Sequence, residues 1–183
     1  MIFIDGQNLL HGAKNFGEQV DCVKLREELT AGRKLKRAYY YGSIPSNPDN
    51  DARLRTQIDK QVAYYHYLEY VGFKTSIIPL KKRYFDFKCD HCNQITRIEK
   101  SIEKGVDIAL VSDMLSLGKA GAYDVAVLVS GDYDYHKAID ELQRSGIIVE
   151  IAYFRKHGIG KDMIRLADRF INLEDVIDKI KKT

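Results

Sequence analysis

The stretch Met1-Ile-Phe-Ile-Asp5-Gly-Gln-Asn8 opens the chain with an apolar run that ends in polar side chains. The stretch Val127-Leu-Val-Ser-Gly-Asp132-Tyr-Asp134 has the same order of apolar strand, glycine turn and acidic residues. In an open parallel α/β sheet, ligands bind outside the carboxyl ends of the strands. We therefore expect folding to gather the polar residues of both stretches, together with Asp107 of Lys104-Gly-Val-Asp107, into one acidic pocket.

Strand and helix patterns alternate along the chain, which favours a parallel sheet with helices on both faces. Strands are expected at residues 1–5, 35–41, 75–80, 124–129 and 147–153, and helices at 21–30, 49–71, 105–117, 133–144, 161–168 and 173–182. Residues 81–100 alternate without a helical period and predict an inserted hairpin. The expected fold is a single α/β domain over residues 1–183 with a five- or six-stranded, mainly parallel sheet.

Composition limits the class of protein. A chain of 183 residues that is 45% hydrophobic suits one domain with a substantial core. The apolar runs are far shorter than the ~20 residues that cross a bilayer, so we expect no membrane segment. The first strand begins at Met1, which leaves no room for a signal peptide, and three cysteines do not make a disulfide scaffold. These features predict a cytoplasmic protein.

The charge pattern suits a polyanionic partner. The formal net charge is +3, and the runs Arg33-Lys-Leu-Lys-Arg37 and Lys81-Lys-Arg83 are locally basic. An acidic pocket inside a mildly basic shell favours a polyanion that divalent cations bridge to the protein. Mg²⁺ and Mn²⁺ are hard cations that prefer carboxylate and amide oxygens. Taken alone, each basic run is more often a solvated surface.

Each polar residue of the pocket also has a simpler explanation. Asp5 could be a turn aspartate, and Asn8 could cap the next helix rather than bind a ligand. Ser130 and Asp132 have the chemistry of helix N-caps, although backbone amides at that helix start could hold a phosphate. The role of Asp134 could be limited to a favourable interaction with the dipole of the helix that it begins.

Two acidic residues of the helix predicted at 105–117 differ in position. Asp107 lies about 60° from the apolar stripe and can point toward a rim. Asp113 falls within the stripe, among Val106, Leu110 and Leu117. A buried carboxylate needs a partner, so Asp113 is either part of a structural pair or orients the site.

Cations and aromatic rings share one flank of the helix predicted at 49–71. The core stripe is expected to contain Leu54, Ile58, Tyr65 and Leu68, and the flank Arg53, Lys60, Tyr64 and Tyr67. Such a flank could bind a single-stranded nucleic acid, or it could pack on the hairpin or on a second subunit. Lys104 could contact the scissile phosphate or remain solvated.

The sequence Cys89-Asp-His-Cys92 has the spacing of half a structural zinc site. A closed site needs four ligands, and no second pair follows at a suitable distance. The pair could bind zinc across two protomers of a homodimer, or it could form an ordinary hairpin tip.

Together these segments resemble a known family. The segments Phe3–Asn8, Lys104–Asp107 with Asp113, Leu128–Asp134 and Ala167-Asp-Arg-Phe170 are similar to the NYN domain family, LabA-like branch, of the PIN-like nuclease fold. The resemblance covers nearly the whole chain apart from the hairpin. Tyr135 departs from the family motif, which more often has Phe at this position.

The resemblance implies a three-layer α/β/α sandwich and Mg²⁺- or Mn²⁺-dependent cleavage of RNA. By the same resemblance, the metal-binding acids would be Asp5, Asp107 and Asp132, with Asn8 and Asp134 assisting. The alternative is a catalytically silent RNA-binding or regulatory module with the same fold. A phosphatase-like site is disfavoured because Gln7 interrupts the expected Asp-x-Asp spacing, and no glycine fingerprint of a dinucleotide site follows the first strand.

Overall fold

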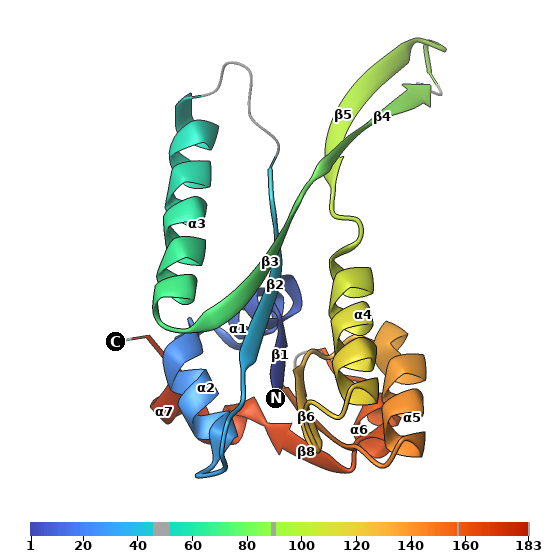
Figure 1. The fold of residues 1–183 in the computed structure, drawn as a ribbon. Coiled ribbons are helices and arrows are strands. Elements are labelled where there is room, and N and C mark those ends of the chain that lie inside the picture. The colour runs from blue at the N-terminus through green and yellow to red at the C-terminus, as the bar shows by residue number, and fades with distance from the viewer. Residues whose placement is uncertain (46–51, 89–90, 157, 183) are drawn as a thin grey trace.

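The computed structural model describes residues 1–45, 52–88, 91–156 and 158–182. Its main sheet contains strands β1 (Ile2–Asp5), β2 (Ala38–Ile44), β3 (Phe73–Pro79), β6 (Val125–Val129), β7 (Ile148–Tyr153) and β8 (Arg169–Asn172). These strands lie in the order β3-β2-β1-β6-β7-β8, and every neighbouring pair is parallel (Figure 1). The prediction of a mainly parallel, five- or six-stranded sheet is confirmed.

Helices cover both faces of the sheet (Figure 1). One face carries α1 (Gly6–Phe16), α2 (Cys22–Thr30), α3 (Ala52–Tyr70) and α7 (Ile177–Ile180), and the other carries α4 (Val106–Lys119), α5 (His136–Arg144) and α6 (Lys161–Leu166). Two short 3₁₀ helices, η1 (Tyr133–Tyr135) and η2 (Leu173–Val176), precede α5 and α7. The result is a three-layer α/β/α sandwich. None of the helices in the described residues is both long and apolar enough to cross a membrane.

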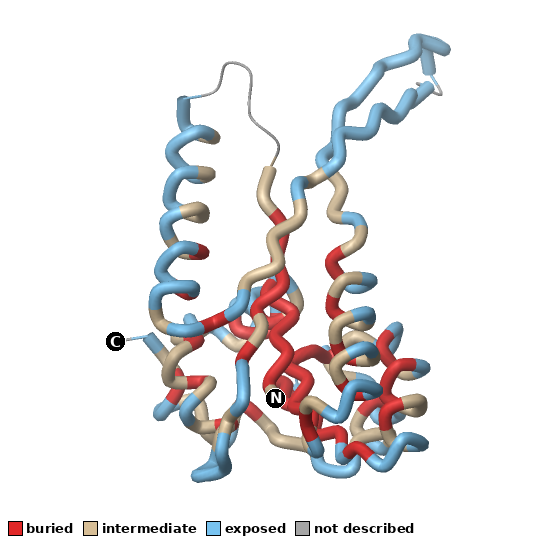
Figure 2. The backbone as a smooth tube through the Cα atoms, in the orientation of Figure 1, coloured by how far each residue is buried: buried red, intermediate tan, exposed pale blue. Residues whose placement is uncertain are grey.

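The core consists of two apolar layers, one on each side of the sheet. Side chains alternate along β1, so Ile2 and Ile4 pack in one layer with Leu9 of α1, and Phe3 packs in the other with Leu110 of α4. Buried residues concentrate along the central strands (Figure 2). This burial on both faces explains the almost continuous apolar character of β1 and β6.

Strand pairing brings the two acidic stretches together at one end of the sheet. β1 lies between β2 and β6, with Ile4 paired to Tyr40 and to Val129. The residues that follow β1 and β6 therefore leave the sheet side by side. The prediction that both stretches meet at the carboxyl ends of the strands is confirmed.

The predicted hairpin consists of β4 (Lys81–Lys88) and β5 (Ile95–Ile102), which pair antiparallel to each other. In the part of the chain that the structure describes, they form a separate two-stranded sheet. It extends away from the body beyond the carboxyl ends of the central strands (Figure 1). Almost all of its described residues are exposed (Figure 2).

Some element predictions were wrong. Strand β2 continues beyond the predicted end at residue 41 through Gly42 and Ser43, which pair with Ile77 and Ile78 of β3. The short strand β8 was not predicted, and α6 ends before it at Leu166. The predicted start of the long helix, residues 49–51, lies outside the described residues.

Helix α1 was also missed. Gly6, which was expected in a turn after the first strand, is the first residue of α1. A Cβ atom at Gly6 would lie 2.4 Å from a ring carbon of Tyr40. The glycine is therefore needed for the close approach of α1 to β2.

Candidate active site

Asp5 is the central carboxylate of the site. It is the last residue of β1 and the N-cap of α1, and its Oδ1 accepts a hydrogen bond of 3.0 Å from the backbone N–H of Asn8. Only 4% of Asp5 is exposed. A cap aspartate satisfies helix donors, and this local role replaces the turn aspartate that was considered as the simpler explanation. It does not account for the other contacts of this carboxylate.

Asn8 joins α1 to the loop after β6. Its side-chain Oδ1 accepts a hydrogen bond of 2.9 Å from the backbone N–H of Gly131. Its backbone carbonyl accepts a bond of 2.8 Å from the hydroxyl of Tyr153. The side-chain oxygen of Asn8 is thus already used in holding the two acidic stretches in register.

The loop after β6 turns back toward Asp5 through Ser130. The buried Ser130 hydroxyl lies 3.4 Å from Asp5 Oδ2 and accepts a bond of 3.2 Å from the backbone N–H of Asp132. The half-buried Asp132 caps η1, because its Oδ1 accepts a bond of 3.0 Å from the backbone N–H of Asp134. Asp132 is therefore the N-cap of η1, whereas Ser130 binds a backbone N–H of the loop that precedes this helix.

The hydroxyl of Tyr135 connects two of the predicted acids. Its oxygen lies 3.0 Å from Asp5 Oδ2 and 3.0 Å from Asp107 Oδ1. Asp107 stands in the first turn of α4 and is exposed, as its helical position predicted. A phenol has one proton, so the hydroxyl donates to only one of the two carboxylates at a time. In the sequence, only the departure from Phe at position 135 hinted at this contact.

A shallow hollow opens beside this pair. It has a volume of about 320 Å³ and is lined by Asp107, Ile108, Val111, Ser112, Asp134 and Tyr135. The exposed Asp134 thus shares a surface hollow with Asp107, whereas the buried Asp5 does not line it.

Electrostatics at Asp5 favour a cation. Burial raises the pKa of Asp5 from 3.8 to about 6, and the negative charges of Asp107 and Glu103 act in the same direction. Hydrogen bonds from the Asn8 backbone and the Tyr135 hydroxyl oppose this rise in pKa. A nearby positive charge would favour the ionised form of Asp5.

Glu103 is a further acidic residue near the site that the sequence reasoning missed. It is half-buried, and its Oε2 accepts a hydrogen bond from the hydroxyl of Ser43 at the end of β2. In the sequence, Glu103 is marked only by its position just before Lys104, where the hairpin ends and leads into α4.

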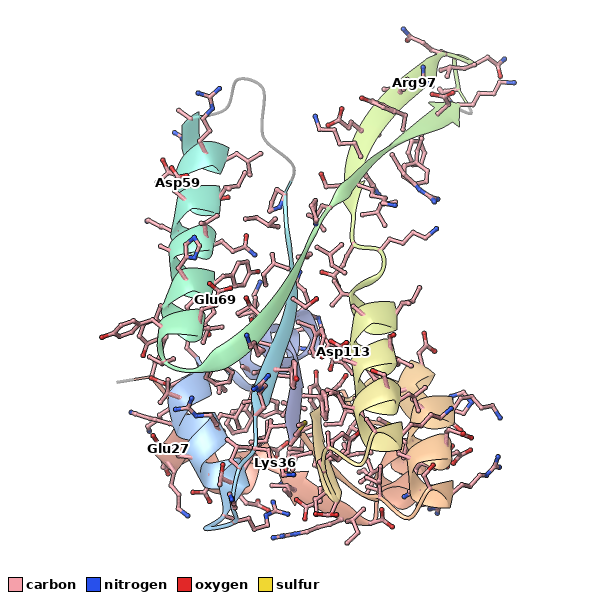
Figure 3. All side chains as sticks on the ribbon, viewed as in Figure 1. Glu27, Lys36, Asp59, Glu69, Arg97 and Asp113 are labelled. Atoms are coloured by element: carbon pink, nitrogen blue, oxygen red, sulfur yellow. The ribbon has the colours of Figure 1, made fainter. Side chains whose placement is uncertain are left out.

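Asp113 forms a structural pair. Its Oδ2 accepts a hydrogen bond of 2.8 Å from the buried hydroxyl of Tyr41 on β2, and it lies on the side of α4 toward the strands (Figure 3). Of the two roles considered for Asp113, this contact supports the structural one.

The donor set of the site fits a hard divalent cation. Asp5 Oδ2 and Asp107 Oδ1 both contact the Tyr135 oxygen, so the two carboxylate oxygens are separated by no more than the sum of those two contacts. Mg²⁺ is commonly held by one or two carboxylates plus waters and substrate phosphates. Within residues 1–45, 52–88, 91–156 and 158–182, no three His, Cys, Asp or Glu side chains form a metal-binding group. Asp132 therefore does not complete a preformed cluster with Asp5 and Asp107.

The predicted substrate-binding flank of α3 is divided between core and surface. Tyr64 is half-buried, its hydroxyl lies 3.1 Å from Cys22 Sγ, and its ring packs edge-on against Tyr40. Tyr67 is exposed, as are Arg53, Lys60 and Lys104. Among the expected core residues of this helix, Tyr65 and Leu68 are buried, and Leu54 and Ile58 are half-buried.

The possible zinc pair cannot be followed through both of its cysteines. Cys89 lies outside the described residues, and Cys92 is an exposed free thiol. Zinc binding across two protomers stays a prediction.

The fold and the acids at the carboxyl ends of its strands define a PIN-like α/β/α domain. The NYN domain family profile matches residues 1–174, and the chain belongs to this family. NYN domains are part of the PIN-like nuclease superfamily and are typically nucleases. The LabA-like branch is compatible with these findings.

A solved structure supports the fold independently. The crystal structure of a protein of unknown function from Vibrio parahaemolyticus matches with a TM-score of 0.69 and 21% identity. The match covers 99% of this chain and 94% of that one. A search of curated proteins finds no significant relative. At this identity the likeness shows the fold alone.

Proposed function

We propose that the protein is a divalent-metal-dependent endoribonuclease. One observation carries this proposal: Asp5 and Asp107, which are far apart in the sequence, share the Tyr135 hydroxyl at the end of the sheet where ligands bind. Membership of the NYN domain family supports nuclease activity and RNA as the substrate class.

Each residue has a part in this proposal. Asp5 and Asp107 would hold Mg²⁺ or Mn²⁺, which supplies an activated water and neutralises charge on the departing oxygen. Asp132 and Asp134 would bind water molecules of the hydrated ion. Asn8 and Ser130 position the loop after β6, and the exposed Lys104 would contact a phosphate.

Substrate and location belong to the same proposal. Exposed cations and the exposed Tyr67 ring on α3 suit single-stranded RNA, because rings stack on bases that are not paired. A reducing, cytoplasmic location is supported by the free thiols of Cys22 and Cys92.

One observation favours a second candidate, a catalytically silent RNA-binding module. The described residues bring two acids to the same hydroxyl but gather no group of three that could hold an ion. A module of this kind would bind RNA without cleaving it.

A cleavage assay separates the two functions. Pooled structured and single-stranded RNA is incubated with Mg²⁺, with Mn²⁺ or with EDTA. We expect metal-dependent cleavage by the wild type and its loss in Asp5→Asn, Asp107→Asn and Asp132→Asn. Asp162→Asn is the matched control, because Asp162 is exposed on α6 and pairs with Arg165. RNA that stays intact with every metal, while still binding, would establish the silent module.

A further inference from the structure

The two faces of the β4–β5 hairpin differ in composition. Side chains alternate along each strand, and the pairing register places partners on the same face. The ion-paired face contains Lys82, Tyr84, Asp86, Lys88, Ile95, Arg97, Glu99 and Ser101. The aromatic-cationic face contains Lys81, Arg83, Phe85, Phe87, Thr96, Ile98, Lys100 and Ile102.

The ion-paired face largely satisfies its own charges. Lys82 lies 3.0 Å from Glu99, and Arg97 lies 3.4 Å from Asp86. The guanidinium of Arg97, labelled in Figure 3, also stands 5.3 Å from the centre of the Tyr84 ring. Apart from Lys88, the charged groups of this face are therefore engaged within the hairpin.

The aromatic-cationic face has no such compensation. It carries three cations and no acidic residue. Within the described part of the chain, Arg83 and Lys100, which are paired across the strands, have no carboxylate at ion-pair distance. Beside them Phe85, Phe87 and Ile98 are exposed by 38%, 50% and 41%. Exposed rings beside uncompensated cations are the pattern that binds single-stranded nucleic acid, with phosphates on the cations and bases on the rings.

The place of the hairpin in the fold suits this role. β5 runs through Glu103 and Lys104 into α4, where Asp107 stands in the first turn. The hairpin and α3 both extend past the carboxyl ends of the central strands, where the candidate active site lies (Figure 1). A single-stranded nucleic acid bound along the hairpin would therefore approach Asp107 from the side of Lys104.

We propose that the aromatic-cationic face of the hairpin binds single-stranded RNA and guides it to the candidate active site. The guiding step rests on the proposed function, whereas binding does not. A second copy of this chain is a poor occupant, because a symmetric contact through the same face would set its cations against identical cations.

Fluorescence anisotropy of a labelled oligouridine in EDTA tests the binding, because no metal-dependent cleavage takes place. We expect Arg83→Glu and Phe85→Ala each to raise the Kd about tenfold or more. The matched controls Lys88→Glu and Tyr84→Ala alter the ion-paired face of the same strand and should change the Kd less than about twofold, since the phosphate and base contacts remain. The salt dependence of Kd should also weaken in Arg83→Glu only.

Several results would overturn the proposal. The first is that the wild type does not bind oligouridine, and the second is that variants of the two faces have equal Kd values. The third is that sedimentation shows a dimer, and that Phe85→Ala dissociates this dimer without changing RNA binding. If polyglutamate, added at the same concentration of negative charges as the oligouridine, displaces the oligouridine, the partner would instead be an acidic protein. If the wild type binds RNA through this face but cleaves none with any metal, the inference stands and the nuclease proposal fails.

Discussion

At the scale of single residues, the Tyr135 hydroxyl contacts both Asp5 and Asp107, the two acids that would hold a cation. We expect Tyr135→Phe to bind Mn²⁺ more tightly than the wild type, because the ion no longer competes with the hydroxyl. Without metal the variant should lose about 1–3 kcal/mol of unfolding free energy, because the buried Asp5 loses a donor. Titration calorimetry and urea unfolding measure the two effects.

Tyr153→Phe is the control for this change. It also removes one buried hydroxyl, but that hydroxyl binds the Asn8 carbonyl rather than an acid. Its Mn²⁺ affinity should equal that of the wild type. Weaker Mn²⁺ binding by Tyr135→Phe would instead make the hydroxyl a ligand or an essential support.

Asp5 makes stability depend on pH. Its pKa is raised from 3.8 to about 6, so the folded protein binds this proton more tightly than the unfolded chain does. The resulting stabilisation is complete below pH 3.8 and is lost as the pH rises to about 6. Asp5→Asn removes this loss, and at pH 8 it should be more stable than the wild type by up to about 3 kcal/mol.

Urea unfolding in EDTA between pH 4 and pH 8 measures this difference. The advantage of Asp5→Asn over the wild type should shrink as the pH falls below about 6. Asp162→Asn, at an exposed carboxylate, should show no such trend. A difference between Asp5→Asn and wild type that is constant with pH would refute the assignment of the buried charge to Asp5.

The sequence indicated which residue types end the strands but not how they touch. Asp5, Asp107 and Asp132 could be selected because acids after apolar strands are visible in the pattern. Tyr135 resembles an ordinary core aromatic, and Glu103 resembles a solvated acid near a helix start. Their contacts with the site depend on how η1 and the hairpin return pack on the sheet, and periodicity does not encode that packing.

At the scale of elements, the contact between α1 and β2 depends on Gly6. We expect Gly6→Ala to cost about 1–3 kcal/mol of unfolding free energy, because its methyl group would overlap the Tyr40 ring. Gly160→Ala is the control, since a Cβ at that helix N-cap meets nothing within 4 Å. Equal urea midpoints for the two variants would show that the Tyr40 ring moves aside without cost.

Helix α1 and strand β8 show why some elements escaped prediction. α1 contains two glycines and two asparagines, which are weak helix formers, so its stability comes from packing Leu9 and Ala13 in the core. β8 is four residues long, and among the described strands it pairs with β7 alone. Elements this short lack a readable period, whereas β1, β6 and the long helices have one.

At the scale of the whole molecule, an ion bound only by the folded form should raise the melting temperature. Mn²⁺ at 100 times its Kd adds about 2.7 kcal/mol, which for a chain of this size is about 5–10 °C. Scanning calorimetry at constant ionic strength measures this shift, and Asp5→Asn should gain less. Equal melting temperatures with and without Mn²⁺, together with no binding by titration, would leave the acids as turn and cap residues.

The central position of β1 also has a consequence for how the chain acquires its structure. Ile2 pairs both with Ala38 and with Val127, so one neighbour of the first strand is made early during synthesis and the other late. Native pairings between such distant residues slow folding, because a large loop must close first. On the ribosome, the apolar β1 must wait with one edge unpaired until β6 emerges, and in that interval it is open to chaperones and to aggregation.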